Sequence, residues 1–227
     1  MIEPPVIQPW GPWFVLRDDL LPGGTKRRAL GALLRDGQEF VYASPAYGFA
    51  QLALAHACAD RGLDASIFVA ERKEIAPLTM RAIRAGAEVF TVPAGRMNVV
   101  TARARTYAAD RGATLLPHGF ASPEFHDALV AVARGLDIDP PQVWCAAGSG
   151  TLARALGDAW PDAEIVAVQV GHPARAGRAR VIVAPERFEQ RATDPPPFPS
   201  AENYDAKAWR FFRAVAPDGA LFWNVGA

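Results

Sequence analysis

A lysine near the start of the chain has the setting of a reactive amine. Lys26 follows the pair Gly23-Gly24, which comes after a short apolar stretch, and it lies where a helix is expected to begin. A glycine turn fixes the backbone behind such a side chain, and desolvation there can keep an amine neutral near pH 7. A neutral lysine amine can attack a carbonyl group. The residues are also compatible with a solvated lysine beside Arg27 and Arg28.

A glycine-rich segment could supply a second piece of chemistry. Residues 145–153, CAAGSGTLA, carry a buried strand pattern into Gly148, Ser149, Gly150 and Thr151, and a helix pattern follows at once. Small residues let the backbone approach a ligand, and the free N–H groups at a helix start favour an anion. A phosphate cradle is one interpretation. A tight strand-to-helix turn with Thr151 as the N-cap is the other, and spacing alone leaves both open.

A nucleotide is one candidate for the phosphate. The segment lacks the Gly-Lys-Ser/Thr of a Walker loop, but the spacing of Gly148, Gly150 and Ala153 fits a dinucleotide fingerprint. That fingerprint expects an acid at the end of the next strand to hold a ribose hydroxyl, and Gln169 stands there instead. An NAD-binding oxidoreductase is therefore an alternative function that lacks one expected residue.

Lys26 and the glycine segment together fit pyridoxal 5'-phosphate, which needs a lysine for a Schiff base and a cradle for its phosphate. Residues 15–30, VLRDDLLPGGTKRRAL, resemble the KREDL…GGNKxRKL segment of pyridoxal-phosphate enzymes of the tryptophan synthase β type. The resemblance is greatest to 1-aminocyclopropane-1-carboxylate deaminase and D-cysteine desulfhydrase. It places Lys26 on the Schiff-base lysine, Arg28 on the arginine two residues later and Leu30 on the leucine.

Three further segments resemble the same family in the same order. AAGSGTLA (146–153) is similar to its GSGGT phosphate loop shortened by one glycine, LLPHGF (115–120) falls on a Pro-x-Gly-Gly segment, and ALFWNVGA (220–227) looks like VLFIHTGG. The resemblance implies a two-lobed α/β fold. We expect mostly parallel sheets with helices on both faces and the cofactor between the lobes.

Two segments depart from the family pattern. The segment after the second strand, S-x-G-N-H in the family, reads SPAYGFAQ here and puts Gly48 at the asparagine that contacts the cofactor's ring hydroxyl. Ser44 or Tyr47 could supply that contact instead. Val225 falls where the relatives have a threonine near the pyridine nitrogen, so the resemblance leaves the partner of that nitrogen open.

The resemblance, together with the residues at the positions that depart from it, predicts roles for individual residues. We expect Lys26 to hold the cofactor and then to act as general base or acid, and Tyr47 to take part in catalysis. The expected cofactor-binding residues are Lys26, Gly148, Ser149, Gly150, Thr151 and Asn224. The expected substrate-binding residues are Ser44, Tyr47, Gly48, His118 and Arg178.

The expected reaction is elimination, deamination or decarboxylation of an α-amino acid. A shortened lobe would also admit an amino-acid group attached to a nucleotide or a DNA base, with Arg175, Arg178 and Arg180 meeting phosphates. A protein of this fold that only carries the cofactor, without catalysis, is a further alternative. We expect the chain to form a homodimer, as the resemblance implies.

Composition narrows the class of protein. The 227 residues carry 24 Lys plus Arg and 24 Asp plus Glu, so net charge points to no polyanionic partner. The two cysteines, Cys58 and Cys145, lie far apart and make no metal spacing, so we expect no metal and a reduced, cytoplasmic protein. The start of the chain contains an acid and four prolines, so we expect no signal peptide. No apolar run approaches the roughly 20 residues of a membrane span.

Strand and helix patterns alternate along the chain, which favours parallel sheets. Expected strands cover 13–17, 39–43, 65–70, 87–92, 114–117, 142–147, 164–170 and 219–225, and expected helices cover 25–37, 48–61, 76–85, 98–111, 122–135, 150–160 and 204–215. The stretch 171–203 is rich in Pro and Arg and is expected to be irregular. We expect a small lobe of residues 44–118 and a large lobe of residues 1–43 plus 119–227.

Overall fold

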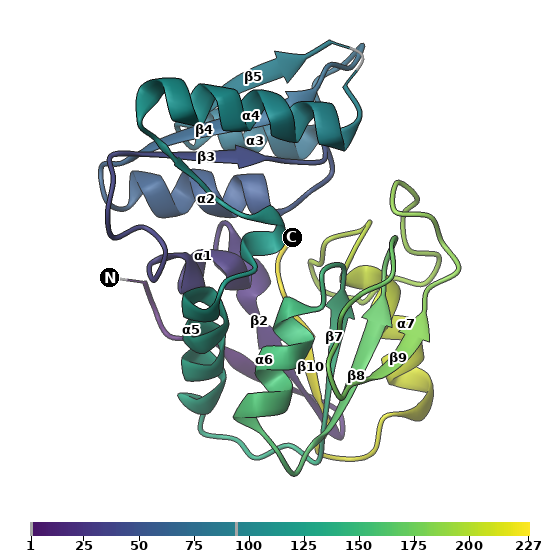
Figure 1. Cartoon of the computed structure of the whole chain (residues 1–227). Coiled ribbons are helices and arrows are strands. Elements are labelled where there is room, and N and C mark those ends of the chain that lie inside the picture. The colour runs from purple at the N-terminus through teal and green to yellow at the C-terminus, as the bar shows by residue number, and fades with distance from the viewer. Residues whose placement is uncertain (1, 94) are drawn as a thin grey trace. The chain divides into compact units, whose positions relative to one another are not determined.

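The computed structural model describes residues 2–93 and 95–227, which divide into two units (Figure 1). The first unit contains the chain up to Arg28 together with His126–Ala227, and the second contains Ala29–Phe125. The second unit is therefore an insertion into the first. Each unit has its own sheet, so the predicted two-lobed α/β fold is confirmed.

The first unit is built on a six-stranded sheet. Its strands, in spatial order, are β1 (Ile7–Trp10), β2 (Trp13–Arg17), β10 (Leu221–Asn224), β7 (Gln142–Ala147), β8 (Glu164–Gln169) and β9 (Arg180–Val183). Strand β1 runs antiparallel to β2, and all other neighbouring pairs are parallel. The carboxyl ends of β2, β10 and β7 therefore meet at one edge of the sheet, which is where open parallel sheets bind ligands.

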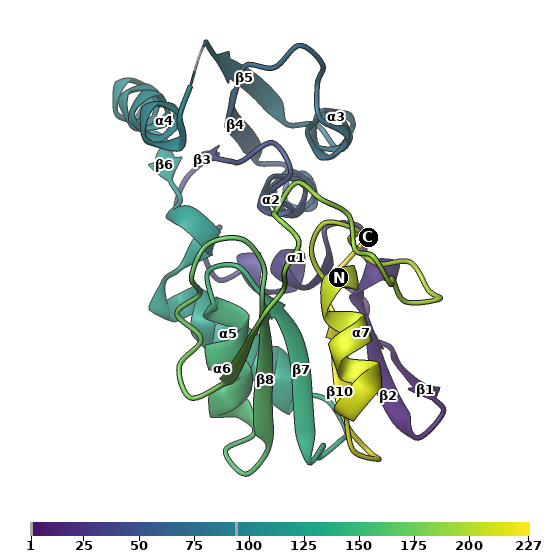
Figure 2. The ribbon, with the colours of Figure 1, turned by 90° about the vertical axis from the view of Figure 1, so that its right-hand side faces the viewer.

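Helices cover both faces of this sheet. Helices α5 (Pro123–Arg134) and α6 (Thr151–Ala159) lie on one face, and α7 (Ala206–Val215) lies on the other (Figure 2). Because side chains alternate along a strand, neighbouring residues pack on opposite helices. Leu16, Cys145 and Trp223 belong to the cluster with α6, whereas Val15, Trp144 and Phe222 belong to the cluster with α7.

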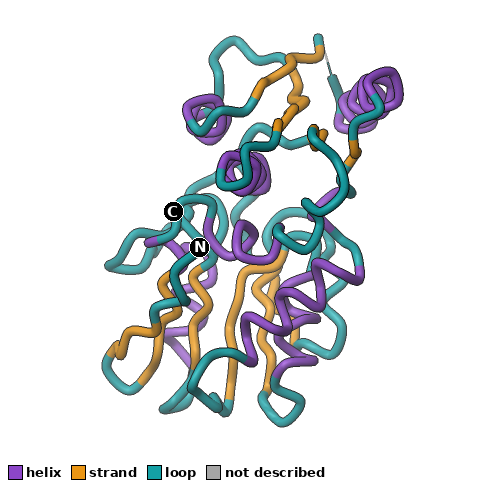
Figure 3. Tube along the Cα trace, turned by 90° about the vertical axis from the view of Figure 1, so that its left-hand side faces the viewer, coloured by secondary structure: helices purple, strands orange, loops and turns teal. Residues whose placement is uncertain are grey.

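The second unit has a smaller sheet that is parallel throughout. Its strands lie in the order β5 (Glu88–Val92), β4 (Asp64–Ala70), β3 (Glu39–Ala43) and β6 (Thr114–Leu115). Helix α4 (Met97–Arg111) packs on one face, while α2 (Ala50–Ala59) and α3 (Pro77–Arg84) lie on the other, as Figure 3 shows by element type. In the described part of the chain, no helix combines the length and the apolar character needed to cross a membrane.

The predicted lobe boundaries need correction. We placed residues 39–43 in the large lobe, but β3 lies inside the four-stranded sheet, between β4 and β6. The first boundary falls after Arg28, within α1 (Gly24–Leu30), and the second falls after Phe125, within α5. A strand belongs to the sheet that supplies its hydrogen bonds, and sequence pattern alone does not reveal which sheet that is.

Three local predictions also differ from the structure. Strand β1 escaped prediction because the proline-rich start matches no strand pattern, and β9 lies in the stretch that we expected to be irregular. Helix α1 ends at Leu30 instead of continuing to residue 37. Gly31 follows directly, and glycine is a poor helix former.

Candidate active site

Lys26 lies in the first turn of α1, just beyond the carboxyl end of β2. A short 3-10 turn (Asp18–Leu20) follows β2, and Gly23 and Gly24 then adopt φ values of +87° and +59°. These left-handed conformations are open to glycine at little cost. The N–H of Thr25 donates to the carbonyl of Val225 over 3.0 Å, which ties the turn to the end of β10.

A buried polar network fixes the residues on either side of Lys26. Asp18 is fully buried and accepts from Thr25 Oγ1 and from Arg28 Nε, both at 2.6 Å. Trp223 Nε1 in turn donates to Thr25 Oγ1 over 2.8 Å. Burial raises the pKa of Asp18, and the charge of Arg28 and the bond from Thr25 offset part of that rise. The lysine is therefore held by two anchored neighbours.

The amine of Lys26 lies over an aromatic ring and near a carboxylate. Its Nζ is 5.8 Å from the centre of the Tyr204 ring. Burial lowers the pKa of the Lys26 amine, while the negative charge of Asp205 acts in the opposite direction. A neutral amine near pH 7 is the state required for attack on a carbonyl or for accepting a proton.

Asp205 is a buried carboxylate without a good hydrogen bond. The residue is 1% exposed, and neither carboxylate oxygen has a hydrogen-bond partner of acceptable geometry. It precedes α7, yet its side chain does not cap that helix. Desolvation raises its pKa to about 8, although Lys26 and the nearby N–H groups of Val225 and Gly226 act to lower it. A carboxylate in this state has the capacity to bind a donor that the protein itself does not supply.

The glycine loop, residues 148–151, connects β7 to α6 and includes the first residue of that helix. Gly150 has φ +83°, and α6 begins at Thr151. The hydroxyl oxygens of Ser149 and Thr151 lie 3.1 Å apart, and the N–H of Thr151 donates to Ser149 Oγ over 3.4 Å. Thr151 is thus the first residue of the helix and not the N-cap that the tight-turn interpretation expects.

Tyr204 connects this loop to the lysine. Its hydroxyl oxygen accepts the N–H of Gly148 over 2.7 Å, and its ring lies under Lys26 Nζ. Burial, with the charge of Asp205, raises the pKa of the Tyr204 hydroxyl well above its usual range, so the group stays protonated. The structure therefore brings together Lys26, the glycine loop, Tyr204 and Asp205 within the first unit.

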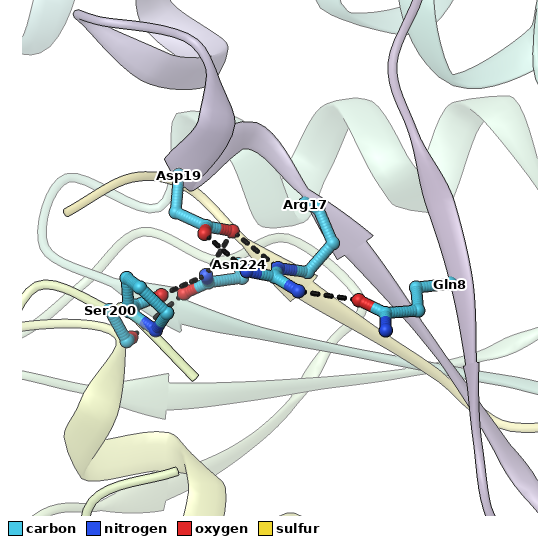
Figure 4. A network of polar contacts seen from close by, with 6 residues as sticks. Gln8, Arg17, Asp19, Ser200 and Asn224 are labelled. Carbon is cyan, nitrogen blue, oxygen red and sulfur yellow. Dashed lines mark hydrogen bonds and ion pairs between the residues drawn. The ribbon is translucent and has the colours of Figure 1, made fainter. Parts of the chain in front are cut away.

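Asn224, which we predicted to bind the cofactor, is engaged in a polar network (Figure 4). Its Nδ2 donates to Asp19 Oδ1 and to the carbonyl of Pro199, and its Oδ1 accepts from Ser200, each over 2.8 Å. Arg17 forms an ion pair with the same Asp19 at 2.7 Å. The Asn224 side chain thus fixes the end of β10 beside the site.

Arg178, which we predicted to bind the substrate, has a structural role. Its guanidinium donates to the carbonyls of Gly157, Trp160 and Ala163 over 2.6 to 3.4 Å. These carbonyls lie at and just beyond the end of α6, where helices leave acceptors unsatisfied. We therefore do not retain Arg178 among the proposed substrate-binding residues.

The other four predicted substrate-binding residues belong to the second unit. Ser44 is fully buried, and its hydroxyl donates to the carbonyl of Pro45 over 3.0 Å. A Cβ at Gly48 would lie 2.9 Å from Ser44 Oγ, so the family's asparagine would not fit this loop unchanged.

Tyr47 and His118 lie in different surroundings. The guanidinium of Arg72 lies over the ring of Tyr47, 5.2 Å from the centre of that ring. His118 begins the short 3-10 turn that ends at Phe120.

Comparison with known proteins places the fold. No family model and no curated protein matches the sequence. A solved ACC deaminase homologue superposes with a TM-score of 0.77 at 17% identity, covering 94% of this chain and 84% of that one. Threonine deaminase isoform 2 from Solanum lycopersicum gives 0.71 at 14% identity, over 95% and 74% of the two chains. Diaminopropionate ammonia lyase from Escherichia coli gives 0.65 at 16% identity, over 94% and 78%.

These neighbours show the fold of the chain. The chain has the fold of the pyridoxal-phosphate enzymes of the tryptophan synthase β type. The resemblance seen in the sequence is confirmed at this level.

The described residues contain no cluster of three or more His, Cys, Asp or Glu side chains that could hold a metal ion. Both cysteines are buried, and burial raises the pKa of each thiol to about 12.

Sequence reasoning missed Tyr204 and Asp205. The segment 204–215 reads as an amphipathic helix, and a Tyr-Asp pair at its start resembles ordinary packing and capping. Tyr204 and Asp205 lie beside Lys26 and the glycine loop only because the start of α7 lies against the carboxyl ends of β10 and β7. The local signal available was an acid at a helix start, and that signal usually means a cap.

Gly150 is required by the protein's own packing, whatever the loop binds. A Cβ there would lie 2.3 Å from the carbonyl oxygen of Arg175 and 2.8 Å from the N of Ala176. We expect Gly150→Ala to lower the stability of the cofactor-free protein by at least about 2 kcal/mol, through backbone strain plus the clash. Gly219→Ala is the control, because φ there is +77° and the nearest atom lies 3.5 Å away. Equal losses in urea unfolding of the two variants would contradict the clash.

Asp205 should make stability depend on pH. In the unfolded chain its carboxyl ionises near pH 4, whereas in the folded protein its pKa is about 8. Between these values the folded state binds the extra proton, so this group's contribution to stability falls as pH rises. Asp205→Asn removes that loss, so we expect the stability of the variant relative to wild type to increase from about pH 4 to 8 and then level off.

Urea unfolding of the cofactor-free proteins at several pH values measures this difference. Tryptophan fluorescence is a suitable probe because all six tryptophans lie in the first unit. A stability difference between Asp205→Asn and wild type that stays constant across this range would show that Asp205 is not held protonated by burial.

Proposed function

We propose that the protein is a pyridoxal-phosphate-dependent enzyme that carries out elimination or deamination of a small free α-amino acid. The observation that carries this proposal is a half-buried lysine, Lys26, within the electrostatic influence of a buried carboxylate that has no hydrogen-bond partner, Asp205, beside a glycine loop at the start of a helix. The fold neighbours include a threonine deaminase and a diaminopropionate ammonia lyase, which supports the reaction class.

The residues present fit the chemical groups of this cofactor. The glycine loop offers backbone N–H groups at the start of α6 and the hydroxyl of Ser149 to a phosphate, with Thr151 as the first residue of the helix. Tyr204 offers a ring face beside Lys26. Asp205 offers a carboxylate that lies against the backbone of Val225, the position where the resemblance left the pyridine nitrogen without a partner. We therefore assign Asp205 as the acceptor for that nitrogen's N–H.

Of the three lysines, Lys26 is the one with a reactive setting. The amine of Lys207 is buried and donates to the carbonyl of Arg187 over 2.8 Å, so it serves to hold a loop. Lys73 lies in an exposed turn of the second unit. Burial also lowers the pKa of Lys207, but its donors already have acceptors.

Lys26 would then perform the proton transfers. When bound, pyridoxal phosphate withdraws electrons from the substrate's α-carbon, which makes the α-proton acidic. The neutral amine of Lys26 takes up that proton, and it can return a proton to the leaving group at the β-carbon. Burial lowers the pKa of the amine and so favours its neutral form, the charge of Asp205 acts in the opposite direction, and the ring of Tyr204 lies beneath the amine.

We assign the substrate carboxylate to the loop of residues 44–49. This loop directly precedes the N terminus of α2, where free N–H groups and the helix dipole favour an anion. The proposed contacts come from Ser44, Tyr47 and Gly48, with His118 as a further substrate-binding residue. Tyr47 remains the proposed second catalytic group.

Two alternative functions have weaker support. For a nicotinamide cofactor, Gln169 would have to face a ribose, but its Oε1 accepts the N–H of Ala174 over 3.1 Å and holds the following segment. For a substrate on a nucleotide or DNA base, the arginines after Gly171 would have to meet phosphates. Arg178 caps α6, and Arg180 pairs with Glu164 at 2.7 Å.

Labelling of Lys26 tests the proposal. Protein purified with pyridoxal phosphate should absorb visible light, and borohydride reduction should fix the cofactor on the peptide that carries Lys26. Label on the Lys73 or Lys207 peptide would overturn the assignment. Lys207→Met is the matched control and should still be labelled on Lys26. Release of a 2-oxo acid and ammonia from small amino acids separates an enzyme from a protein that only carries the cofactor.

A further inference from the structure

Arg154 places a positive charge where the helix itself disfavours one. It is the fourth residue of α6, so its charge adds to the positive end of the helix dipole. Its guanidinium donates to the carbonyl of Arg175 and, over 3.3 Å, to Thr151 Oγ1. Both acceptors are neutral oxygens. An anion bound at the glycine loop would turn this unfavourable charge into a favourable one.

The segment after β8 holds Arg154 against the loop. The N–H of Arg175 donates to the carbonyl of Ser149 over 3.2 Å, and the carbonyl of Arg175 accepts from Arg154. Gly177 has φ +65°, and a Cβ there would lie 3.0 Å from Arg154 Cγ, so the glycine leaves room for the arginine stem. The carbonyl of Arg175 and the space left by Gly177 therefore fix the position of the Arg154 guanidinium.

The hydroxyl groups of Ser149 and Thr151 form one hydrogen bond with each other, so one of their two O–H donors remains available. Ser149 Oγ and Thr151 Oγ1 share one hydrogen bond, in which only one of the two O–H groups donates. Arg154 donates to Thr151 Oγ1, which polarises that hydroxyl and makes it the better donor to Ser149. Ser149 Oγ also accepts the N–H of Thr151. The O–H of Ser149 is then the one left to donate to a ligand.

We infer that Arg154 is a positioning residue for the cofactor's phosphate. Acting through Thr151, it directs the Ser149 O–H toward the phosphate, and its charge favours the dianion. This inference rests on the proposed function, because it names the residue that adapts the same loop to a phosphate ester. It differs from a purely structural role, in which Arg154 would only hold the segment 174–177.

Paired ligands separate the two roles. Pyridoxal phosphate and pyridoxal differ only in the phosphate, so we compare their affinities by absorbance and fluorescence titration of wild type and Arg154→Met. We expect the variant to bind pyridoxal phosphate about tenfold or more weakly, with pyridoxal changed less than about twofold. The ³¹P resonance of the bound phosphate should also titrate at higher pH in the variant.

Arg178→Met is the matched control, because it removes donors from the same segment without touching the loop. It should not discriminate between the two ligands. Arg154→Lys should restore part of the discrimination through its charge. In a Thr151→Val background, Arg154→Met should lose the part of its effect that acts through Thr151 and keep the part that comes from its charge.

Equal weakening of both ligands by Arg154→Met, or full additivity with Thr151→Val, would overturn the inference while leaving the proposed function intact. Failure of wild-type protein to bind either ligand at Lys26 would instead overturn the proposed function, and this inference with it.

Discussion

A buried carboxylate without a hydrogen-bond partner sets the strongest constraint on the first unit. Asp205 is 1% exposed, and the charge that acts on it most strongly is that of Lys26. Burial of such a group is costly unless a donor completes it. The chain nevertheless brings β2, β10 and α7 together at this point, with Trp209 and Trp223 buried in the cores on either side of the sheet. A bound cofactor that donates a hydrogen bond to this group would stabilise the folded state.

Two adjacent aspartates divide the work of supporting this site. Asp18 accepts from Thr25 and Arg28 and so fixes the turn that carries the lysine. Asp19 accepts from Arg17 and Asn224 and so fixes the end of β10. Asp18 and Asp19 are adjacent but bind different partners. The segment after β2 therefore links the turn that carries Lys26 to β10, the strand that ends beside Asp205.

The sequence predicts the elements that are encoded locally. Strand β7 and the loop after it follow from an apolar run that ends in small residues, whereas the role proposed for Lys26 comes from its glycine turn together with the family resemblance. Tyr204 and Asp205 could not be found in this way, because their role depends on which strands α7 covers. The expectation that Arg178 binds the substrate rests on the resemblance, which places the arginine-rich stretch after Gly171 beside the cofactor, but only the structure shows the carbonyls at the end of α6 that Arg178 satisfies. Strand β9 carries three consecutive β-branched residues, but the run is short and lies in a stretch rich in Pro and Arg, and the structure shows that it pairs with the parallel edge of β8.

The state of the cofactor's ring nitrogen tests the central role of Asp205 most directly. The protein can be loaded with pyridoxal phosphate labelled with ¹⁵N in the ring, and the chemical shift of that nitrogen reports whether it carries a proton. We expect a protonated nitrogen at pH 7 in wild type and an unprotonated one in Asp205→Asn. An unprotonated nitrogen in wild type, or the same shift in both proteins, would contradict the account.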